Sequence, residues 1–305
     1  MYHLTKIDDG AAQTPPAFAE HSVGYRRQVL ISQHVGSPHM TLSIGHLDVG
    51  GHVAPTLHSF ELSIYVLSGE LAVTTLGQTT LLPADHVICV PLGTSYALRT
   101  SQGPVRWLQM ASPAEINDGR RQDTFFSSEA LVESTPVVPD MRDPRNRHAV
   151  RFDPDSMDLR RLAGGSAVDA PTVSPSMSTA LLAYSGIGVK MLIDQQRGAQ
   201  LHTMFVVDYQ PTAIAHPHDH PFEEAYIFVE GEVHGLIDGI SMVLRPGDVL
   251  WAGVGCDHGF ENRGPGLVRW IEVQSPQPPA RHSYRFSREW EHLATKLHDE
   301  EKHEG

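Results

Sequence analysis

Histidine and glutamate residues in the second half of the chain have the spacing of metal ligands. His216, His218 and His220 occupy every second position of one short segment. On a β-strand this spacing turns the side chains to one face, so a pair of them can converge on one cation. Glu224 follows His220 closely, and His258 lies beyond a later glycine-rich turn. Neutral imidazoles and one carboxylate suit divalent ions of borderline softness, such as Mn(II), Fe(II) and Ni(II).

The elements that must position these residues occur twice in the sequence. His58 meets His220 when the chain is aligned with itself at an offset of 162 residues, and the same register continues for many positions. Further matched pairs are Pro55/Pro217, Phe60/Phe222, Glu61/Glu223, Gly69/Gly231, Val87/Val249 and Gly93/Gly255. A register held over such a length indicates a duplicated domain and excludes a short-period solenoid.

Each copy has a sequence pattern typical of short strands separated by turns. In the second copy, β-branched and aromatic runs at 225–229, 233–237 and 249–252 alternate with glycine-containing turns. The 22 prolines and 26 glycines of the chain suit such a turn-rich protein and suit long helices poorly. Short strands at this spacing close into a small antiparallel barrel or jelly roll, which removes exposed sheet edges. The sequence therefore predicts an all-β protein with two barrels.

The domain limits follow from the repeat and from the composition between its copies. We expect an N-terminal barrel over residues 1–114 and a C-terminal barrel over 178–286. A connector rich in Pro, Asp, Arg and Ser spans residues 115–177. Residues 287–305 carry Trp290, Leu293 and Leu297 at helical spacing, which predicts a short helix followed by a charged tail.

The second copy resembles the cupin family, whose two sequence motifs appear in order. The first motif is represented by His218, His220, Glu224 and Gly231, without an evident leading Gly; the second is represented by Gly247, Gly255, His258 and Asn262, with Gly253 where Pro is usual. The resemblance implies a duplicated cupin, or bicupin, built from jelly-roll barrels. It also implies one metal ion bound by His218, His220, Glu224 and His258.

The repeat distinguishes the two adjacent acidic residues. Glu223 has a counterpart in Glu61, whereas Leu62 stands at the position of Glu224. We therefore assign the ligand role to Glu224. The remaining ligand positions of the first copy are also lost, since Thr56 stands for His218 and Tyr96 for His258, with His58 left alone. We expect the N-terminal barrel to be free of metal, with His58 as a remnant.

Other residues near the motifs are given structural roles. We place His216 outside the ligand set and interpret Cys256 as a small buried side chain, not as a reactive thiol. Four large side chains are expected to fill or line the C-terminal barrel: Met204, Tyr226, Phe228 and Trp251. Which of these contact a ligand is left open.

Composition limits the partners and the compartment. The formal net charge of −13 repels phosphate backbones and disfavours nucleic acid as a partner. The two cysteines, Cys89 and Cys256, are expected to be free thiols in a reducing compartment. The chain has no stretch resembling a signal peptide or a membrane span, so we expect a cytoplasmic protein. The expected partner is a small-molecule substrate, and a homodimer is an open alternative to pairing of the two barrels within a monomer.

The resemblance implies three classes of function. The first is a metal-dependent oxidoreductase, either a dioxygenase or an oxalate-decarboxylase-like enzyme, acting on a small oxygenated organic acid or an enol. Mn or Fe is the expected cofactor, with Ni, Zn or Co as alternatives. The second is a metal-dependent aminohydrolase, because the order of the two barrels is similar to that of ureidoglycine aminohydrolases. The third is a cupin that binds a small molecule without catalysis. An intact ligand set favours an enzyme.

Overall fold

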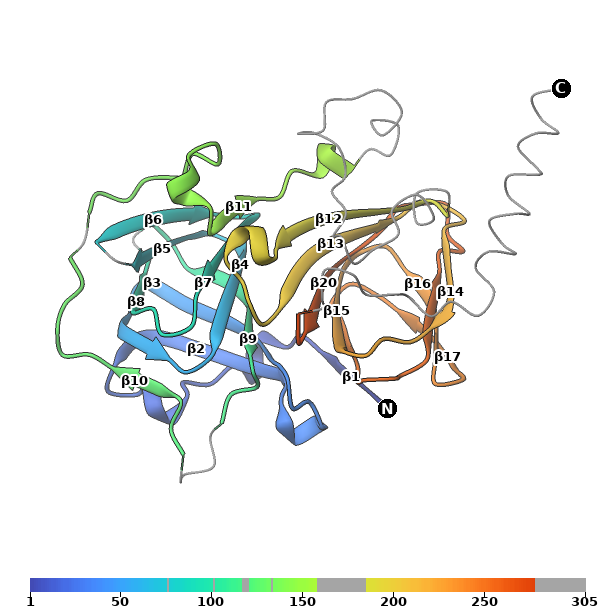
Figure 1. The fold of residues 1–305 in the computed structure, drawn as a ribbon, viewed down its shortest axis with the longest axis horizontal. Helices are drawn as coiled ribbons and strands as arrows, with labels where there is room; N and C mark the ends of the chain where they lie inside the picture. The colour runs from blue at the N-terminus through green and yellow to red at the C-terminus, as the bar shows by residue number, and fades with distance from the viewer. Residues whose placement is uncertain (76, 101, 117–120, 133, 158–184, 278–305) are drawn as a thin grey trace, which may run out of the picture.

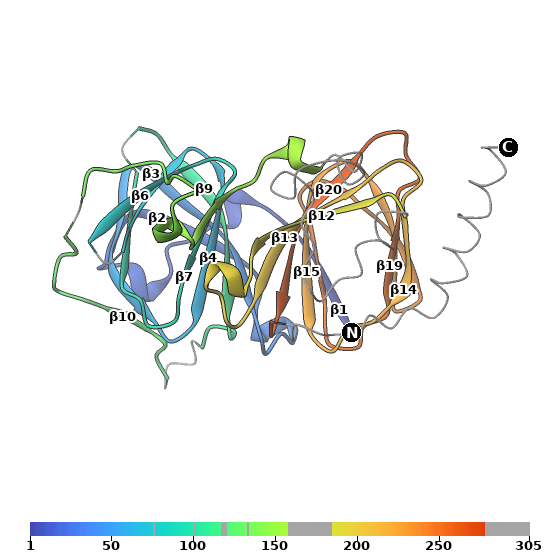
Figure 2. The ribbon, with the colours of Figure 1, turned by 45° about the horizontal axis from the view of Figure 1, so that its top comes forward.

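The chain forms two β-barrels that lie side by side (Figures 1 and 2). The computed structural model describes residues 1–157 and 185–277, apart from 76, 101, 117–120 and 133. Strands and short 3-10 turns make up its regular structure. The helix predicted at 287–305 lies outside the described residues, as do 158–177 of the connector and 178–184 and 278–286 of the predicted C-terminal barrel. Among the described residues, no helix has the length and apolarity to cross a bilayer.

The N-terminal barrel and the connector contribute one large antiparallel sheet. Its strand order is β11-β7-β4-β9-β3-β8-β5-β6, with β2 and β10 also paired to β3. The strands are β2 (Ser22–Ile31), β3 (Thr41–His58), β4 (Glu61–Ser68), β5 (Glu70–Thr75), β6 (Gln78–Pro83), β7 (His86–Val90), β8 (Tyr96–Arg99), β9 (Val105–Ser112), β10 (Thr124–Phe126) and β11 (Ala149–Arg151). The long strand β3 bends through the barrel and contributes to both of its walls.

The C-terminal barrel consists of two sheets. The larger has the order β1-β18-β15-β20-β13-β12, and the smaller has the order β14-β19-β16-β17. The strands are β1 (Tyr2–Lys6), β12 (Ile187–Ile193), β13 (Thr203–Tyr209), β14 (Ile214–His218), β15 (Glu223–Glu230), β16 (Val233–Ile237), β17 (Ile240–Leu244), β18 (Asp248–Ala252), β19 (His258–Glu261) and β20 (Val268–Ser275). The predicted all-β architecture with two barrels is confirmed.

Three apolar cores hold the molecule together. One fills each barrel, and a third joins the outer faces of the two large sheets. Tyr226 and Phe228 lie inside the C-terminal barrel, as expected. Met204 and Trp251, however, belong to the core between the barrels, so their predicted place in the barrel interior is wrong. Both faces of these strands are buried, and alternation alone does not distinguish the interior from the interface.

The two barrels also exchange edge strands. β1 precedes the N-terminal barrel in sequence but pairs with β18 of the C-terminal barrel, with Leu4 opposite Leu250. β11 precedes the C-terminal barrel but pairs with β7 of the N-terminal barrel, with Ala149 opposite Ile88. Because β7 and β18 are equivalent in the repeat, each large sheet is extended at the same edge by a strand from the segment that leads into the other barrel.

Two equivalent glutamates, Glu61 and Glu223, form polar contacts across the interface between the barrels. Glu61 accepts a hydrogen bond of 2.7 Å from the backbone amide of Gln200 and lies 2.8 Å from Nδ1 of His202. Glu223 accepts a hydrogen bond of 2.5 Å from the hydroxyl of Ser37. Each carboxylate therefore binds groups of the opposite barrel. This shared role explains why the first acid of the pair recurs in both copies whereas the second does not.

The turn after β15 requires glycine. Gly231 has a φ of 73°, and a Cβ atom there would lie 2.3 Å from the carbonyl oxygen of Leu267. Gly69 occupies the same position in the first copy with a φ of 81°, and its Cβ would lie 2.4 Å from the carbonyl oxygen of Pro104. A left-handed backbone and a close approach both exclude a side chain at this turn. The motif glycine thus shapes the barrel and does not touch the ligand positions.

Candidate metal centre

Three strands and one turn bring the predicted ligands together. His218 ends β14 and lies directly opposite His258 at the start of β19, beside an irregularity in the strand pairing. His220 stands in the turn that follows β14, and Glu224 is the second residue of β15. The pairing of β14 with β19 explains why two histidines so far apart in sequence share one site.

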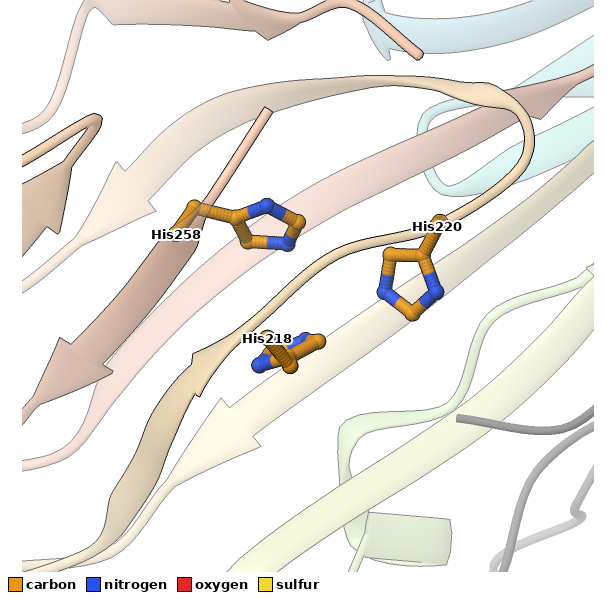
Figure 3. A group of neighbouring side chains, drawn as sticks. All are labelled: His218, His220 and His258. Atoms are coloured by element: carbon orange, nitrogen blue, oxygen red, sulfur yellow. The ribbon is translucent and has the colours of Figure 1, made fainter. Parts of the chain in front are cut away.

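The three histidines form a compact cluster inside the barrel. Donor atoms of His218, His220 and His258 all lie within 4.8 Å of one another, and each residue is at least nine-tenths buried. Figure 3 shows the three imidazole rings turned toward a common space. Ring centroids of His218 and His258 are 4.5 Å apart, and those of His218 and His220 are 4.9 Å apart. This cluster can bind a metal ion.

Backbone carbonyls orient two of these rings. Nδ1 of His218 donates to the carbonyl oxygen of His216 at 2.7 Å, and Nδ1 of His258 donates to that of Cys256 at 3.0 Å. A carbonyl only accepts, so Nδ1 carries a proton in both rings and Nε2 is the atom available to a metal, the arrangement typical of imidazoles that bind metals. Although burial lowers it, the contact with Glu224 raises the pKa of His258 overall, so without a metal its Nε2 can carry a proton toward that carboxylate. Burial, followed by the neighbouring imidazoles, holds the pKa of His218 well below its ordinary value, which favours the neutral ligand form. The donor set therefore fits a divalent cation.

Glu224 lies against two of the three histidines. Its carboxylate oxygens are 3.0 Å from Nε2 of His258 and 3.5 Å from Nε2 of His220. The amide of Gln274 and the hydroxyl of Tyr226 donate to the same carboxylate at 2.8 and 2.5 Å. Although burial raises its pKa, the contacts with His220 and His258 lower the pKa of Glu224 overall. The site thus holds an ionised carboxylate in a fixed orientation.

A small cavity adjoins the cluster within the C-terminal barrel. Its volume is about 50 Å³, so it admits only a small molecule. Apolar side chains form most of its wall: Ile187, Val189, Phe205, Val207, Ala215 and Phe260. The remaining lining residues are His218, His220, Glu224, His258, Tyr209, Tyr226, Trp270 and Glu272. An apolar wall around a few converging polar groups is typical of a ligand-binding site.

Glu272 is a site residue that the sequence analysis missed. Its side chain lines the cavity and accepts a hydrogen bond of 2.9 Å from the indole of Trp270. Burial and the neighbouring Glu224 carboxylate raise the pKa of Glu272 well above its usual value. The signal was available in the repeat, where Gln109 occupies the equivalent position.

The equivalent region of the N-terminal barrel contains a different polar network. Nε2 of His58 lies 2.7 Å from the hydroxyl of Tyr96, and its Nδ1 lies 3.0 Å from the hydroxyl of Thr124. Burial lowers the pKa of His58 to about 4, and the charges of Arg27 and Glu115 also act on this ring. Both nitrogens of the remnant histidine are therefore engaged by side chains of its own barrel and connector.

Four further residues named in the sequence analysis have roles outside the proposed ligand set. His216 lines a groove on the outside of the barrel, away from the cavity. Cys256 and Cys89 are free and buried, as predicted, and burial raises the pKa of Cys256 to about 12. Asn262 donates from its side-chain amide to the carbonyls of Tyr209 and Gly266 at 3.0 and 2.8 Å. It fixes the backbone at the end of β13 and does not reach the cavity.

The two adjacent glutamates are expected to differ in their effect on metal affinity. Glu224→Gln removes the ionised carboxylate beside His220 and His258, so we expect Mn(II) affinity to fall at least about tenfold. Glu223→Gln alters the contacts with Ser37 and Trp251 between the barrels and is expected to leave the affinity nearly unchanged. Mn(II) titrations of both purified variants make the comparison. Equal losses in the two would contradict the placement of Glu224 in the site.

Comparisons with known proteins agree with this architecture. Residues 205–274 match the cupin domain family. A search of curated protein sequences gave no match. Among solved structures, the chain is similar to a glyoxylate-induced protein from Pseudomonas aeruginosa, with a TM-score of 0.61, 15% identity and coverage of 94% of this chain and 90% of that one.

Two enzymes of known structure share the same fold. Salicylate 1,2-dioxygenase from Pseudoaminobacter salicylatoxidans gives a TM-score of 0.64 at 13% identity, covering 83% of this chain and 74% of that one. Oxalate decarboxylase from Bacillus subtilis gives 0.57 at 13% identity, covering 87% of this chain and 74% of that one. Identities this low establish the fold alone. Residues 205–274 thus form a cupin domain, and the chain as a whole has the fold of the two-barrel cupins.

Proposed function

We propose that this chain is a divalent-metal-dependent oxidoreductase, a dioxygenase or an oxalate-decarboxylase-like enzyme, whose substrate is a small oxygenated molecule. The observation that carries the proposal is the buried cluster of His218, His220 and His258, with Glu224 against it, at the wall of a small cavity inside the barrel. Two proteins with this fold are a dioxygenase and a decarboxylase. Mn or Fe is the proposed metal, since both accept imidazole and carboxylate ligands.

The chain's own residues would hold the ion and prepare the cavity. We assign His218, His220, Glu224 and His258 as its ligands. A bound divalent ion supplies positive charge that polarises the oxygen atoms of a chelating substrate. The carbonyls of His216 and Cys256 hold two of the rings in place, and Gln274 and Tyr226 orient the carboxylate. Apolar side chains on the wall reduce the number of polar groups around the site, which strengthens charge interactions inside the cavity.

Oxygen uptake distinguishes the oxidoreductase from a hydrolase of the same fold. We expect the Mn(II)- or Fe(II)-loaded protein, supplied with a panel of small hydroxy acids, dicarboxylic acids and enols, to consume O₂ or release CO₂ with at least one of them. Addition of a chelator should abolish this turnover, because a chelated ion no longer supplies the polarising charge. An oxygen electrode and a headspace CO₂ measurement record it.

Two other results would contradict the proposal. Release of ammonia from ureides without O₂ consumption would favour an aminohydrolase. Stoichiometric binding of the panel compounds, with neither gas exchange nor ammonia release, would favour a binding protein without catalysis.

A further inference from the structure

The chain that follows β9 returns to the wall of its own barrel as β10. The three residues of β10 lie opposite three residues of β3, in the pairs Thr124/His58, Phe125/Leu57 and Phe126/Thr56. The hydroxyl of Thr124 lies 3.0 Å from Nδ1 of His58. Directly after the strand, the amide of Ser127 donates to the carbonyl oxygen of Pro55 at 2.9 Å. A segment beyond the last long strand of the barrel thus contacts the histidine that is equivalent to His220.

The C-terminal barrel has an equivalent edge at β14. His218 of β14 lies opposite His258 of β19. In the other barrel, Thr56 of β3 lies opposite Tyr96 of β8 in the same way. Within the described residues β14 is the outermost strand of its sheet, on the side that corresponds to the place of β10. A second copy of β10 would extend the sheet at this edge.

A short motif recurs in the chain after each barrel. The sequence Phe-Ser-x-Glu occurs at 126–129, where β10 ends, and again at 286–289. Its Phe lies 14 residues after Ser112, the end of β9, and 11 residues after Ser275, the end of β20. A loop absorbs a difference of this size, because surface connections tolerate insertions and deletions. The motif therefore indicates that residues 284–286 correspond to β10.

Residues 284–286 complement the edge that they would meet. In the register of β10 the pairs are Tyr284/His220, Arg285/Asp219 and Phe286/His218. The middle pair brings opposite charges together, which stabilises an antiparallel pairing. Its counterpart in the first copy faces outward, since Phe125 is 42% exposed. An ion pair can therefore stand at this position in contact with water.

We propose that residues 284–286 form a strand on the edge of β14 and the turn after it, and that Tyr284 is a positioning residue for His220. The first copy has threonine at this place, and a tyrosine hydroxyl stands further from the backbone, so here the ring meets the imidazole. Nε2 of His220 lies 3.5 Å from the carboxylate of Glu224, and the ring of Phe222 stacks on the imidazole with centroids 4.7 Å apart. Tyr284 completes the support of a ligand that stands in a turn. The role of Tyr284 rests on the metal site proposed above, whereas the strand pairing does not.

A disulfide between paired positions tests the strand. Asp219→Cys and Arg285→Cys place two thiols opposite each other, where Cα atoms of antiparallel strands are about 4.5–5.5 Å apart, within reach of a disulfide. The metal-free full chain carrying both changes is treated with oxidised glutathione. Digestion without reductant, followed by mass spectrometry, detects the joined peptides.

The control pair is Asp219→Cys with Arg288→Cys, in which the second thiol lies beyond the strand. We expect the pair with Arg285→Cys to cross-link at least about tenfold faster, because the proposed register holds only these two Cα atoms within disulfide distance. Equal rates in the two pairs would overturn this inference and leave the proposed function standing.

Mn(II) titration tests the role of Tyr284. Tyr284→Ala removes the ring beside His220, so we expect the affinity to fall about tenfold, as for other groups that orient metal ligands. Tyr284→Phe keeps the ring and should bind Mn(II) as the wild type does. The matched control is Thr124→Ala, which changes the equivalent place beside His58 and should also leave the affinity unchanged.

Wild-type affinity in Tyr284→Ala, or an equal loss in Tyr284→Phe, would overturn the positioning role. A wild type that binds no Mn(II) would overturn the proposed function and the role of Tyr284 together, while the cross-link alone decides the strand pairing.

Discussion

Replacing His220 with alanine is expected to abolish metal binding while the protein stays folded. The substitution removes one of three imidazoles whose donor atoms lie within 4.8 Å of one another. Loss of a ligand costs more than loss of the hydrogen bonds that orient a ligand, which already reduces affinity about 10- to 100-fold. We expect elemental analysis to find about one equivalent of metal in the wild type and less than about a tenth in the variant.

His216→Ala is the matched control for this experiment. It removes an imidazole from the same short segment, but one that lines the outer groove. Its metal content should equal that of the wild type. Full metal retention in His220→Ala, or an equal loss in His216→Ala, would refute the assignment of the cavity histidines as ligands.

The second large effect is expected from a buried ion pair of the N-terminal barrel. Arg27 donates from both terminal nitrogens to the carboxylate of Glu115, at 2.8 and 2.7 Å. The two side chains are only 11% and 12% exposed. Arg27→Met leaves the Glu115 carboxylate buried without its partner, which costs roughly 3–5 kcal/mol of unfolding free energy. Urea denaturation followed by fluorescence measures the loss.

The double variant Arg27→Met, Glu115→Gln provides the control. Removing both charges eliminates the unpaired carboxylate, so much of the lost stability should return. Metal content should remain near one equivalent throughout, because the pair lies in the other barrel. A double variant no more stable than Arg27→Met alone would show that packing of the arginine, and not its charge, stabilises this barrel.

The repeat and the strand pattern were sufficient to predict the two barrels, and the resemblance to the cupin motifs was needed to predict the histidine cluster. Strand alternation does not explain the cluster, because His220 lies in the turn after β14 and an irregularity in the strand pairing lies between Ala215 and His218, with His216 in the outer groove. The strands and turns of the barrels depend on local geometry, which sequence encodes directly, whereas the cluster depends on the pairing of β14 with β19. Comparison of the two copies assigned the ligand role to Glu224 and not to Glu223. The structure agrees with this assignment, because the carboxylate of Glu223 contacts Ser37 of the opposite barrel.

Long-range pairing could not be predicted in the same way. Trp251 was placed in the barrel interior, yet it packs between the barrels, because strands buried on both faces give no polar side to indicate direction. Glu272 was missed because an acid in a β-strand is ordinarily taken as solvent-facing. The strand pairing places it opposite Tyr226, where it lines the cavity.

The reciprocal exchange of β1 and β11 limits how the gene can be divided for expression. A fragment beginning at residue 178 would lack β1 and leave the backbone amides and carbonyls of β18 without their partners. A fragment ending at residue 114 would lack β11 and leave β7 in the same state. Open edges of this kind recruit strands from other molecules and promote aggregation. To obtain soluble halves, each half must therefore be fused through a linker to the strand that it would lack, β1 for the C-terminal barrel and β11 for the N-terminal barrel.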